Sequence, residues 1–157
     1  MTSFGFRVYG IPAPQGSKIP GVSSKTGKMF VREQSSKTLR PWRQDVKEAA
    51  ILAMADLPIL TGPVRLHVDF YMPRPASVTP RRRPLPMVAP DLDKLVRGVG
   101  DALKAAGVYR DDAQICSIRA TKYYATDDSN GSPGAWIVIS EITYTAPQGS
   151  NDTTGKR

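Results

Sequence analysis

Residues 90–115 read PDLDKLVRGVGDALKAAGVYRDDAQI, and the rest of the chain is best understood outward from this stretch. Its apolar residues recur at intervals of three and four, which predicts a helix with one apolar stripe against a core. Pro90 disfavours helix before it, Asp91 suits the N-cap, and Gly107 can take the left-handed turn after the helix. The stripe comprises Leu92, Leu95, Val96, Val99, Ala102, Leu103 and Ala106.

The other face of this predicted helix is charged. Asp93, Arg97 and Asp101 are each four residues from the next, so they are neighbours on the helix surface. The pair Asp111–Asp112 follows just beyond Gly107. Aspartates are therefore expected along the exposed side of a rigid element and at both of its ends.

The flanking segments predict a single α+β domain in which a mixed β-sheet is covered by helices, in the approximate order β-β-α-β-α-β-β. The clearest strand is residues 63–72, where apolar and polar residues alternate. Loops are predicted at residues 12–26 and, as a flexible and basic segment, at residues 73–90. The other expected elements are strands at residues 4–11, 29–32, 114–125 and 135–145 and a helix at residues 38–57.

Two further expectations concern individual elements. The helix at residues 38–57 has apolar side chains on two faces, which indicates either deep burial or packing on a partner. Its Trp42 is expected in the core rather than as a platform for stacked bases. Cys116 shares strand parity with Ile118 and Ala120, and is expected to be a buried structural residue.

Length and composition favour one domain over residues 1–146, followed by a disordered tail at residues 147–157. A chain of 157 residues with 40% hydrophobic content can build its own core. The longest apolar run, residues 49–55, is too short to cross a bilayer, and the N-terminus does not resemble a signal peptide. The single cysteine suits a reducing compartment, so a cytoplasmic location in a bacterial cell or phage-infected host is expected.

The charge is distributed unevenly. Residues 1–83 hold 14 Lys and Arg against 5 Asp and Glu, a balance of +9, whereas the remainder holds 8 against 9, a balance of −1. A basic half attracts a phosphate backbone, and a local cluster of aspartates repels it unless cations intervene. This combination points to chemistry on nucleic acid.

Clustered aspartates suggest a metal site. Phosphodiester hydrolysis needs an activated water and positive charge at the phosphate, which two magnesium ions roughly 4 Å apart can supply. Asp91 and Asp93, joined by a carboxylate of the turn at residues 110–112, could hold them, with Arg97 steadying the scissile phosphate. The alternative is that Asp91 is only a cap, Asp93 only a first-turn charge and the later pair a solvated turn. His67 is the only histidine, which excludes a site built on imidazoles.

Several basic residues are candidates for DNA contact. The run Arg81-Arg82-Arg83 directly precedes the carboxylates, so contact with DNA is favoured over a merely solvated run. Lys18, Arg74 and Lys94 complete the expected DNA-binding set.

The segment PDLDKLVRGVGDALKAAGVYRDDAQI closely resembles the signature of the RusA family of Holliday junction resolvases, small endonucleases of bacteria and their phages. The family pattern runs Asp-x-Asp-Asn, a lysine three residues after that asparagine, Asp-Ala-Leu, then Asp-Asp. Weaker, colinear similarity extends over about residues 4–145.

This resemblance implies a homodimer that binds four-way or other branched DNA and nicks two opposed strands symmetrically, using Mg²⁺, with Mn²⁺ as a substitute. By position, Asp91, Asp93 and Asp112 match the family's essential metal-binding aspartates, and Asp111 matches a less critical companion. Lys94 and Arg97 depart from the family: Lys94 stands where it usually has asparagine, and Arg97 stands where it has its functional lysine. Arginine keeps the charge but cannot donate a proton near neutral pH.

The departure at Arg97 leaves a second hypothesis open, a catalytically weak or inactive protein that binds junctions or other branched DNA. It predicts salt-sensitive binding without metal-dependent cleavage. A third, a glycosyltransferase with an Asp-x-Asp motif, is disfavoured because the chain is too short for the usual nucleotide domain. It would also leave the second aspartate pair unexplained.

Overall fold

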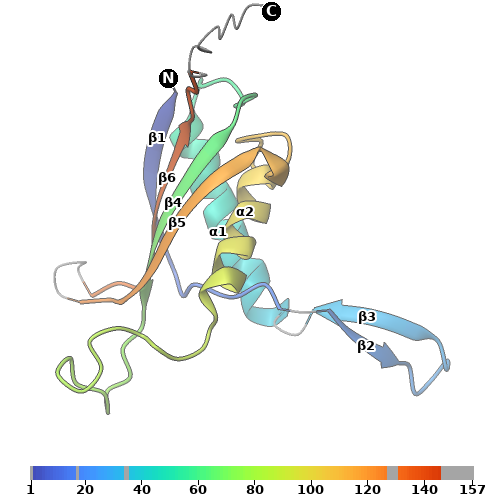
Figure 1. Ribbon diagram of the computed structural model, residues 1–157. Helices are drawn as coiled ribbons and strands as arrows, with labels where there is room; N and C mark the ends of the chain where they lie inside the picture. The colour runs from blue at the N-terminus through green and yellow to red at the C-terminus, as the bar shows by residue number, and fades with distance from the viewer. Residues whose placement is uncertain (1, 17, 34–35, 127–130, 146–157) are drawn as a thin grey trace, which may run out of the picture.

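The computed structural model of the chain describes residues 2–16, 18–33, 36–126 and 131–145, without the side chains of residues 18, 19, 31–33 and 36. It is an α+β fold with a mixed sheet and two helices, as predicted (Figure 1). The elements in chain order are β1 (Ser3–Tyr9), β2 (Lys18–Val22), β3 (Met29–Glu33), α1 (Ser36–Met54), β4 (Val64–Met72), α2 (Leu92–Ala105), the 3₁₀ turn η1 (Asp112–Gln114), β5 (Ile115–Tyr124) and β6 (Gly134–Glu141).

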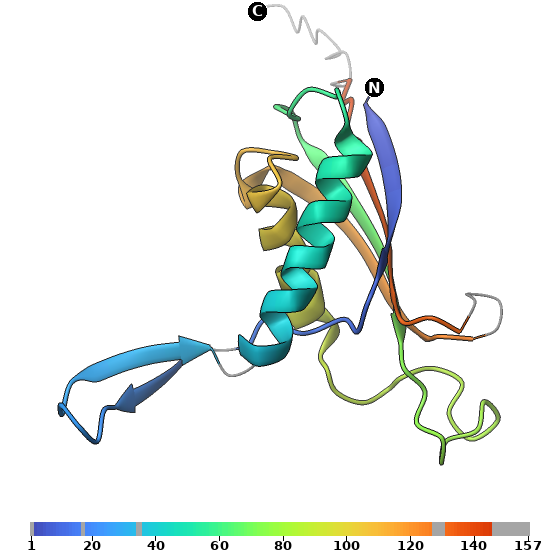
Figure 2. The ribbon, with the colours of Figure 1, turned by 180° about the vertical axis from the view of Figure 1, so that it is seen from behind.

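The main sheet has the strand order β1-β6-β4-β5. The strand β4 pairs antiparallel with β6 and parallel with β5, and β1 pairs antiparallel with β6. Both helices lie on one face of this sheet, and its other face is open (Figures 1 and 2). The core therefore lies between one sheet layer and one helix layer, and α2 is held against β4 and β5.

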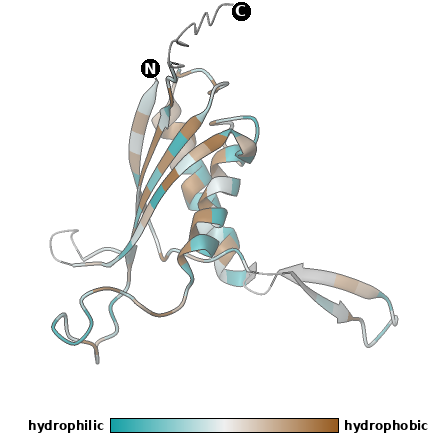
Figure 3. Cartoon of the chain, viewed as in Figure 1, coloured by the Kyte–Doolittle hydropathy of each residue, from teal (hydrophilic) through white to brown (hydrophobic). Residues whose placement is uncertain are grey.

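Alternation along β4 builds this core. Val64, Leu66, Val68 and Phe70 are fully buried, and the residues between them lie on the open face. Figure 3 shows the resulting alternation of apolar and polar residues along the strands of the sheet. Burial of such a row is the main favourable contribution to folding, at about 1.5–3 kcal/mol for each fully buried apolar side chain.

The first helix is shorter than predicted. α1 ends at Met54, where Ala55 takes a positive φ of 44°, and does not continue to Leu57. Trp42 is only 1% exposed, so its assignment to the core is confirmed. Leu52 is 80% exposed, which excludes deep burial of the whole helix and leaves packing on a partner as a prediction.

Two predictions about strands were wrong. Residues 12–26 were expected to be a loop, yet β2 lies within them and pairs with β3 as a separate two-stranded sheet. Pro20 and Gly21 hide this strand, because both residues are depleted in strands. Cys116 is exposed rather than buried. It lies on the edge strand β5, where the register with β4 passes from Ile115 to Ser117 and skips it.

The predicted tail at residues 147–157 lies outside the described residues. Among the described helices, none is long and apolar enough to cross a membrane.

Candidate active site along helix α2

The helix α2 presents its aspartates as the sequence predicted. Asp91 is the N-cap residue, with extended φ and ψ of −68° and 137°, and Gly107 takes a positive φ of 78° just after the helix. The side chain of Asp91 makes no capping hydrogen bond, so its carboxylate is not consumed by the helix end. The residues that α2 buries are Leu95, Gly98, Val99, Gly100, Ala102 and Leu103.

The N-terminal end of α2 carries a first pair of carboxylates. Asp91 and Asp93 are both exposed, and the Nζ of Lys94 lies 3.3 Å from the Oδ2 of Asp91. Arg97, one turn further on the same face as Asp93, is exposed. This end therefore offers carboxylate ligands beside two fixed positive charges.

The turn after α2 is built around Asp111. Its carboxylate accepts a hydrogen bond from the backbone N–H of Ala113, while the side chain of Gln114 accepts from the N–H of Asp111, which completes a capping box. The Nζ of Lys104 donates a 2.8 Å hydrogen bond to the Oδ2 of Asp111. The bond from Lys104 and the bond from Ala113 hold the pKa of Asp111 below its ordinary value. Asp111 is thus committed to the turn and to Lys104.

Asp112 has a different environment. Its Oδ1 is buried and, within the described part of the chain, has no hydrogen-bond partner. Burial raises the pKa of Asp112, and the neighbouring carboxylate of Asp101 raises it further. Two carboxylates that face each other with an unpartnered oxygen leave room for a cation, which would satisfy both.

The aspartates therefore fall into two groups. Asp93 and Asp101 are eight residues apart on α2, which corresponds to about 12 Å along the helix axis. The structure brings Asp112 beside Asp101 and does not place it beside Asp91 or Asp93. Within the described ranges, no three carboxylate, imidazole or thiolate side chains lie together as a metal site. Convergence of Asp91, Asp93 and Asp112 on shared metal ions stays a prediction.

The Arg-rich loop at residues 73–90 contributes some free cations and some structural ones. The guanidinium of Arg74 lies 4.0 Å from the centre of the Tyr124 ring and donates to the carbonyl of Arg83. Arg83 in turn donates to the Tyr124 hydroxyl. Arg81 and Arg82 are exposed, and their side chains are the ones left available to a ligand. Of the remaining DNA-binding candidates, Lys94 pairs with Asp91, and the side chain of Lys18 lies outside the described part of the chain.

Two residues that position the site were missed in the sequence. Lys122 on β5 donates hydrogen bonds of 2.8 Å to the carbonyls of Val88 and Pro90, directly before Asp91. Gln114 donates to the carbonyls of Leu60 and Gly62, which anchors the turn that carries Asp112. A capping-box signal, an Asp followed three residues later by Gln, could have identified Gln114. Nothing local marks Lys122.

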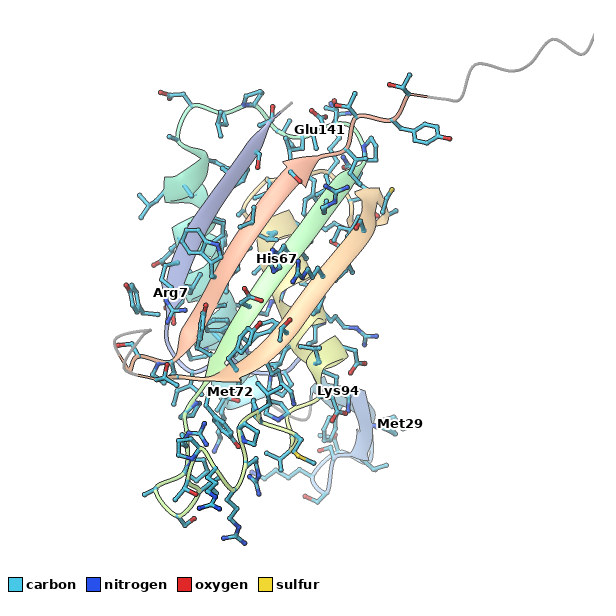
Figure 4. All side chains as sticks on the ribbon, turned by 60° about the vertical axis from the view of Figure 1, so that its left-hand side comes forward. Arg7, Met29, His67, Met72, Lys94 and Glu141 are labelled. Carbon is cyan, nitrogen blue, oxygen red and sulfur yellow. The ribbon has the colours of Figure 1, made fainter. Side chains whose placement is uncertain are left out.

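The single histidine lies elsewhere. His67 is on the open face of the sheet, opposite the helices, with its Nε2 3.3 Å from the Oδ1 of Asp69 (Figure 4). Since α2 packs on the other face, the sheet separates this pair from the aspartate row.

Comparison with known proteins agrees with this site. Residues 12–131, which include the whole of α2 and the turn after it, match the family model described as endodeoxyribonuclease RusA. The chain is also 32% identical over 149 residues to the uncharacterised protein YqaN of Bacillus subtilis strain 168, an alignment that covers 88% of this chain and 96% of that protein. We conclude that the chain belongs to the RusA family of Holliday junction endodeoxyribonucleases.

Proposed function

We propose that this protein is a magnesium-dependent, structure-selective endonuclease that resolves four-way DNA junctions by paired symmetric cuts in the bacterial cytoplasm. The observation that carries the proposal is the exposed row on α2, in which Arg97 stands between Asp93 and Asp101 and the unpartnered Oδ1 of Asp112 lies beside Asp101. Carboxylates and an arginine on one rigid helix are what hydrolysis of a phosphodiester requires.

The carboxylates present fit a divalent metal. Asp91, Asp93 and Asp112 are the residues that we expect to hold it, with Asp111 as a companion. Magnesium commonly takes one or two protein carboxylates and completes its shell with waters and substrate phosphate, so neither pair needs a third protein ligand. When bound, magnesium lowers the pKa of a coordinated water and neutralises charge on the phosphate. The buried, unpartnered oxygen of Asp112 supports this fit.

The basic residues have separate tasks. Arg97 is placed to fork onto the phosphate oxygens between the two carboxylate pairs, but its guanidinium stays protonated and cannot supply a proton to the leaving oxygen. Lys94 is the nearest side chain on α2 that could do so, although it is held by Asp91. Arg81 and Arg82, exposed on the loop that leads into Asp91, are placed to bind the DNA backbone.

Paired cutting also requires two active sites. A four-way junction has approximate two-fold symmetry, so two symmetric nicks are most simply made by a homodimer with one site in each protomer. Light scattering at micromolar concentration should give about twice the chain mass of 17.1 kDa. A strictly monomeric mass would count against paired cutting.

The proposal is tested by cleavage of a synthetic mobile four-way junction and a matched linear duplex, over tenfold steps of magnesium and then of manganese. We expect paired symmetric nicks on the junction alone, with none in the presence of a chelator. Tight junction binding without nicks in either metal would instead identify a catalytically weak or inactive branched-DNA-binding protein, the outcome that substitution of the family lysine by Arg97 would explain.

A further inference from the structure

The β2–β3 hairpin, residues 18–33, stands away from the body of the molecule as an arm (Figures 1 and 2). The two strands pair only with each other, in the register Gly21 with Phe30 and Val22 with Met29. A two-stranded hairpin is at best marginally stable alone in water, so a projecting hairpin of this kind is expected to have a ligand that covers it.

The surface of the arm is both basic and apolar. Residues 18–33 contain four Lys and Arg against one Glu, a net charge of +3. Met29 is 79% exposed and Val22 is 65% exposed, close to the exposed side chains of Lys25 and Lys28 in and beside the turn. The arm therefore carries positive charge around an uncovered apolar pair.

The position of the arm connects it to the candidate active site. The chain enters the arm just after Gln15, whose backbone N–H donates a 3.0 Å hydrogen bond to the carbonyl of Lys94 on α2. The carbonyl of Ala13 also lies against Gly98, where an added Cβ would approach it to 3.4 Å. Figure 4 shows Met29 on the arm and Lys94 at the start of α2 at the same end of the molecule. The loop at residues 73–90 extends from that same end (Figure 1).

Electrostatics choose between the possible occupants. A second copy of this chain carries a net charge of +8, so a basic arm docked on it would meet a like-charged protein. Duplex DNA is a polyanion, and its major groove, about 12 Å wide, admits a two-stranded β-ribbon. Strands of five residues extend about 17 Å, enough to cross such a groove. Exposed methionine and valine beside lysines are also the side chains that unstack base steps.

We propose that the β2–β3 arm is a DNA-binding ribbon that grips a duplex arm of the branched substrate beside the α2 site. Lys25 and Lys28 contact phosphates, and the Val22–Met29 pair contacts the bases. This inference rests on the proposed function, because it takes the DNA held by the arm to be the DNA presented to Asp91 and Asp93.

The test is binding of a fluorescein-labelled four-way junction by anisotropy, in a chelator so that no cleavage occurs, across a series of salt concentrations. The double variant Lys25→Ala/Lys28→Ala is expected to bind roughly tenfold or more weakly and to lower the slope of log K against log salt by about 1.8, or about 0.9 for each phosphate contact. Met29→Ser should weaken binding with no change in slope. The matched control is Arg65→Ala/Arg119→Ala, which removes two exposed charges from the open sheet face and should leave the slope unchanged.

The outcomes separate this inference from the proposed function. If the wild-type protein cleaves junctions but the Lys25→Ala/Lys28→Ala variant binds them with wild-type affinity and slope, the assignment of the arm is wrong and the nuclease stands. If Met29→Ser instead changes the mass of the protein by light scattering and leaves DNA binding intact, the arm contacts a second copy. A wild-type protein that neither binds nor cleaves branched DNA would overturn both proposals.

Discussion

The Nζ of Lys94 lies 3.3 Å from the Oδ2 of Asp91, one turn apart at the start of α2. Both side chains are substantially exposed, at 40% and 61%, so the pair is screened by solvent and contributes little to stability. Its importance is local, because a protein cation stands beside a carboxylate that we expect to bind magnesium. The position is one where the family usually has a neutral asparagine.

Replacement of Lys94 by asparagine is therefore expected to lower the magnesium concentration that gives half-maximal cleavage. An exposed ion pair of this kind is worth about 0.2–1 kcal/mol, which corresponds to a shift of up to about fivefold. A magnesium titration of cleavage rate measures it, with Lys104→Asn as a control because Lys104 pairs with Asp111 instead. An unchanged or higher magnesium requirement would show that Lys94 does not compete with the metal.

The carboxylates themselves can be separated by single substitutions. Asp91→Asn, Asp93→Asn and Asp112→Asn should each abolish junction cleavage, since each removes a proposed metal ligand, while junction binding in a chelator survives. Asp111→Asn should retain more activity, because Asp111 is engaged by Lys104 and Ala113. Retained cleavage in any two of the first three variants would refute the site assignment.

The role of Arg97 can be read from two substitutions. Arg97→Ala should reduce cleavage by about 10²-fold or more, on the scale of losing one charge-stabilising donor in an active site. Arg97→Lys should keep most of the wild-type activity if only the positive charge matters. A large gain with lysine, accompanied by a new decline of the rate at alkaline pH, would instead show that a proton donor is needed at this position.

The environment of Asp112 predicts a stability that depends on pH. Its carboxyl has a raised pKa in the folded chain, so the folded state binds more protons than the unfolded state, and stability falls as the pH rises through that pKa. Asp112→Asn should therefore raise the thermal midpoint near neutral pH, and the gain should shrink on acidification toward the ordinary value of 3.8. Calorimetry from about pH 4 to about pH 7.5 measures this; an equal or lower midpoint at neutral pH would contradict it.

Lys122 should affect activity without being part of the chemistry. Lys122→Met keeps the length of the side chain but removes both hydrogen bonds to the carbonyls that precede Asp91. We expect slower cleavage at saturating magnesium, with junction affinity reduced much less, and partial rescue by Lys122→Arg. Equal losses in affinity and in cleavage would indicate that Lys122 contacts DNA directly.

The elements with strong local patterns could be predicted from the sequence. The stripe of α2 and the alternation of β4 are set by periodicity, and the core residues Leu95, Val99 and Val68 follow directly from it. By contrast, β2 carries Pro20 and Gly21, and pairing with β3 overrides their low strand propensity. The exposure of Cys116 depends on an irregular register at a sheet edge, which alternation alone does not reveal.

The candidate site was predictable in its residues but not in its arrangement. Asp91, Asp93 and Asp112 were identified from their spacing and from the family signature. That Asp112 lies beside Asp101 follows from how the chain turns after Gly107, a tertiary property with no local signal. The tether from Lys122 to Pro90 joins residues 32 positions apart, and no sequence pattern announces it.

The bonds of Gln114 have a consequence for how this protein can vary. Gln114 donates to the carbonyls of Leu60 and Gly62, more than fifty residues earlier in the chain. The acidic turn is thereby clamped to the loop before β4, so a single-residue insertion or deletion at positions 60–62 would displace Asp112. In a library of shuffled or loop-grafted variants, the length of this distant loop should thus be as strictly constrained as the aspartates themselves, although nothing in it takes part in the chemistry.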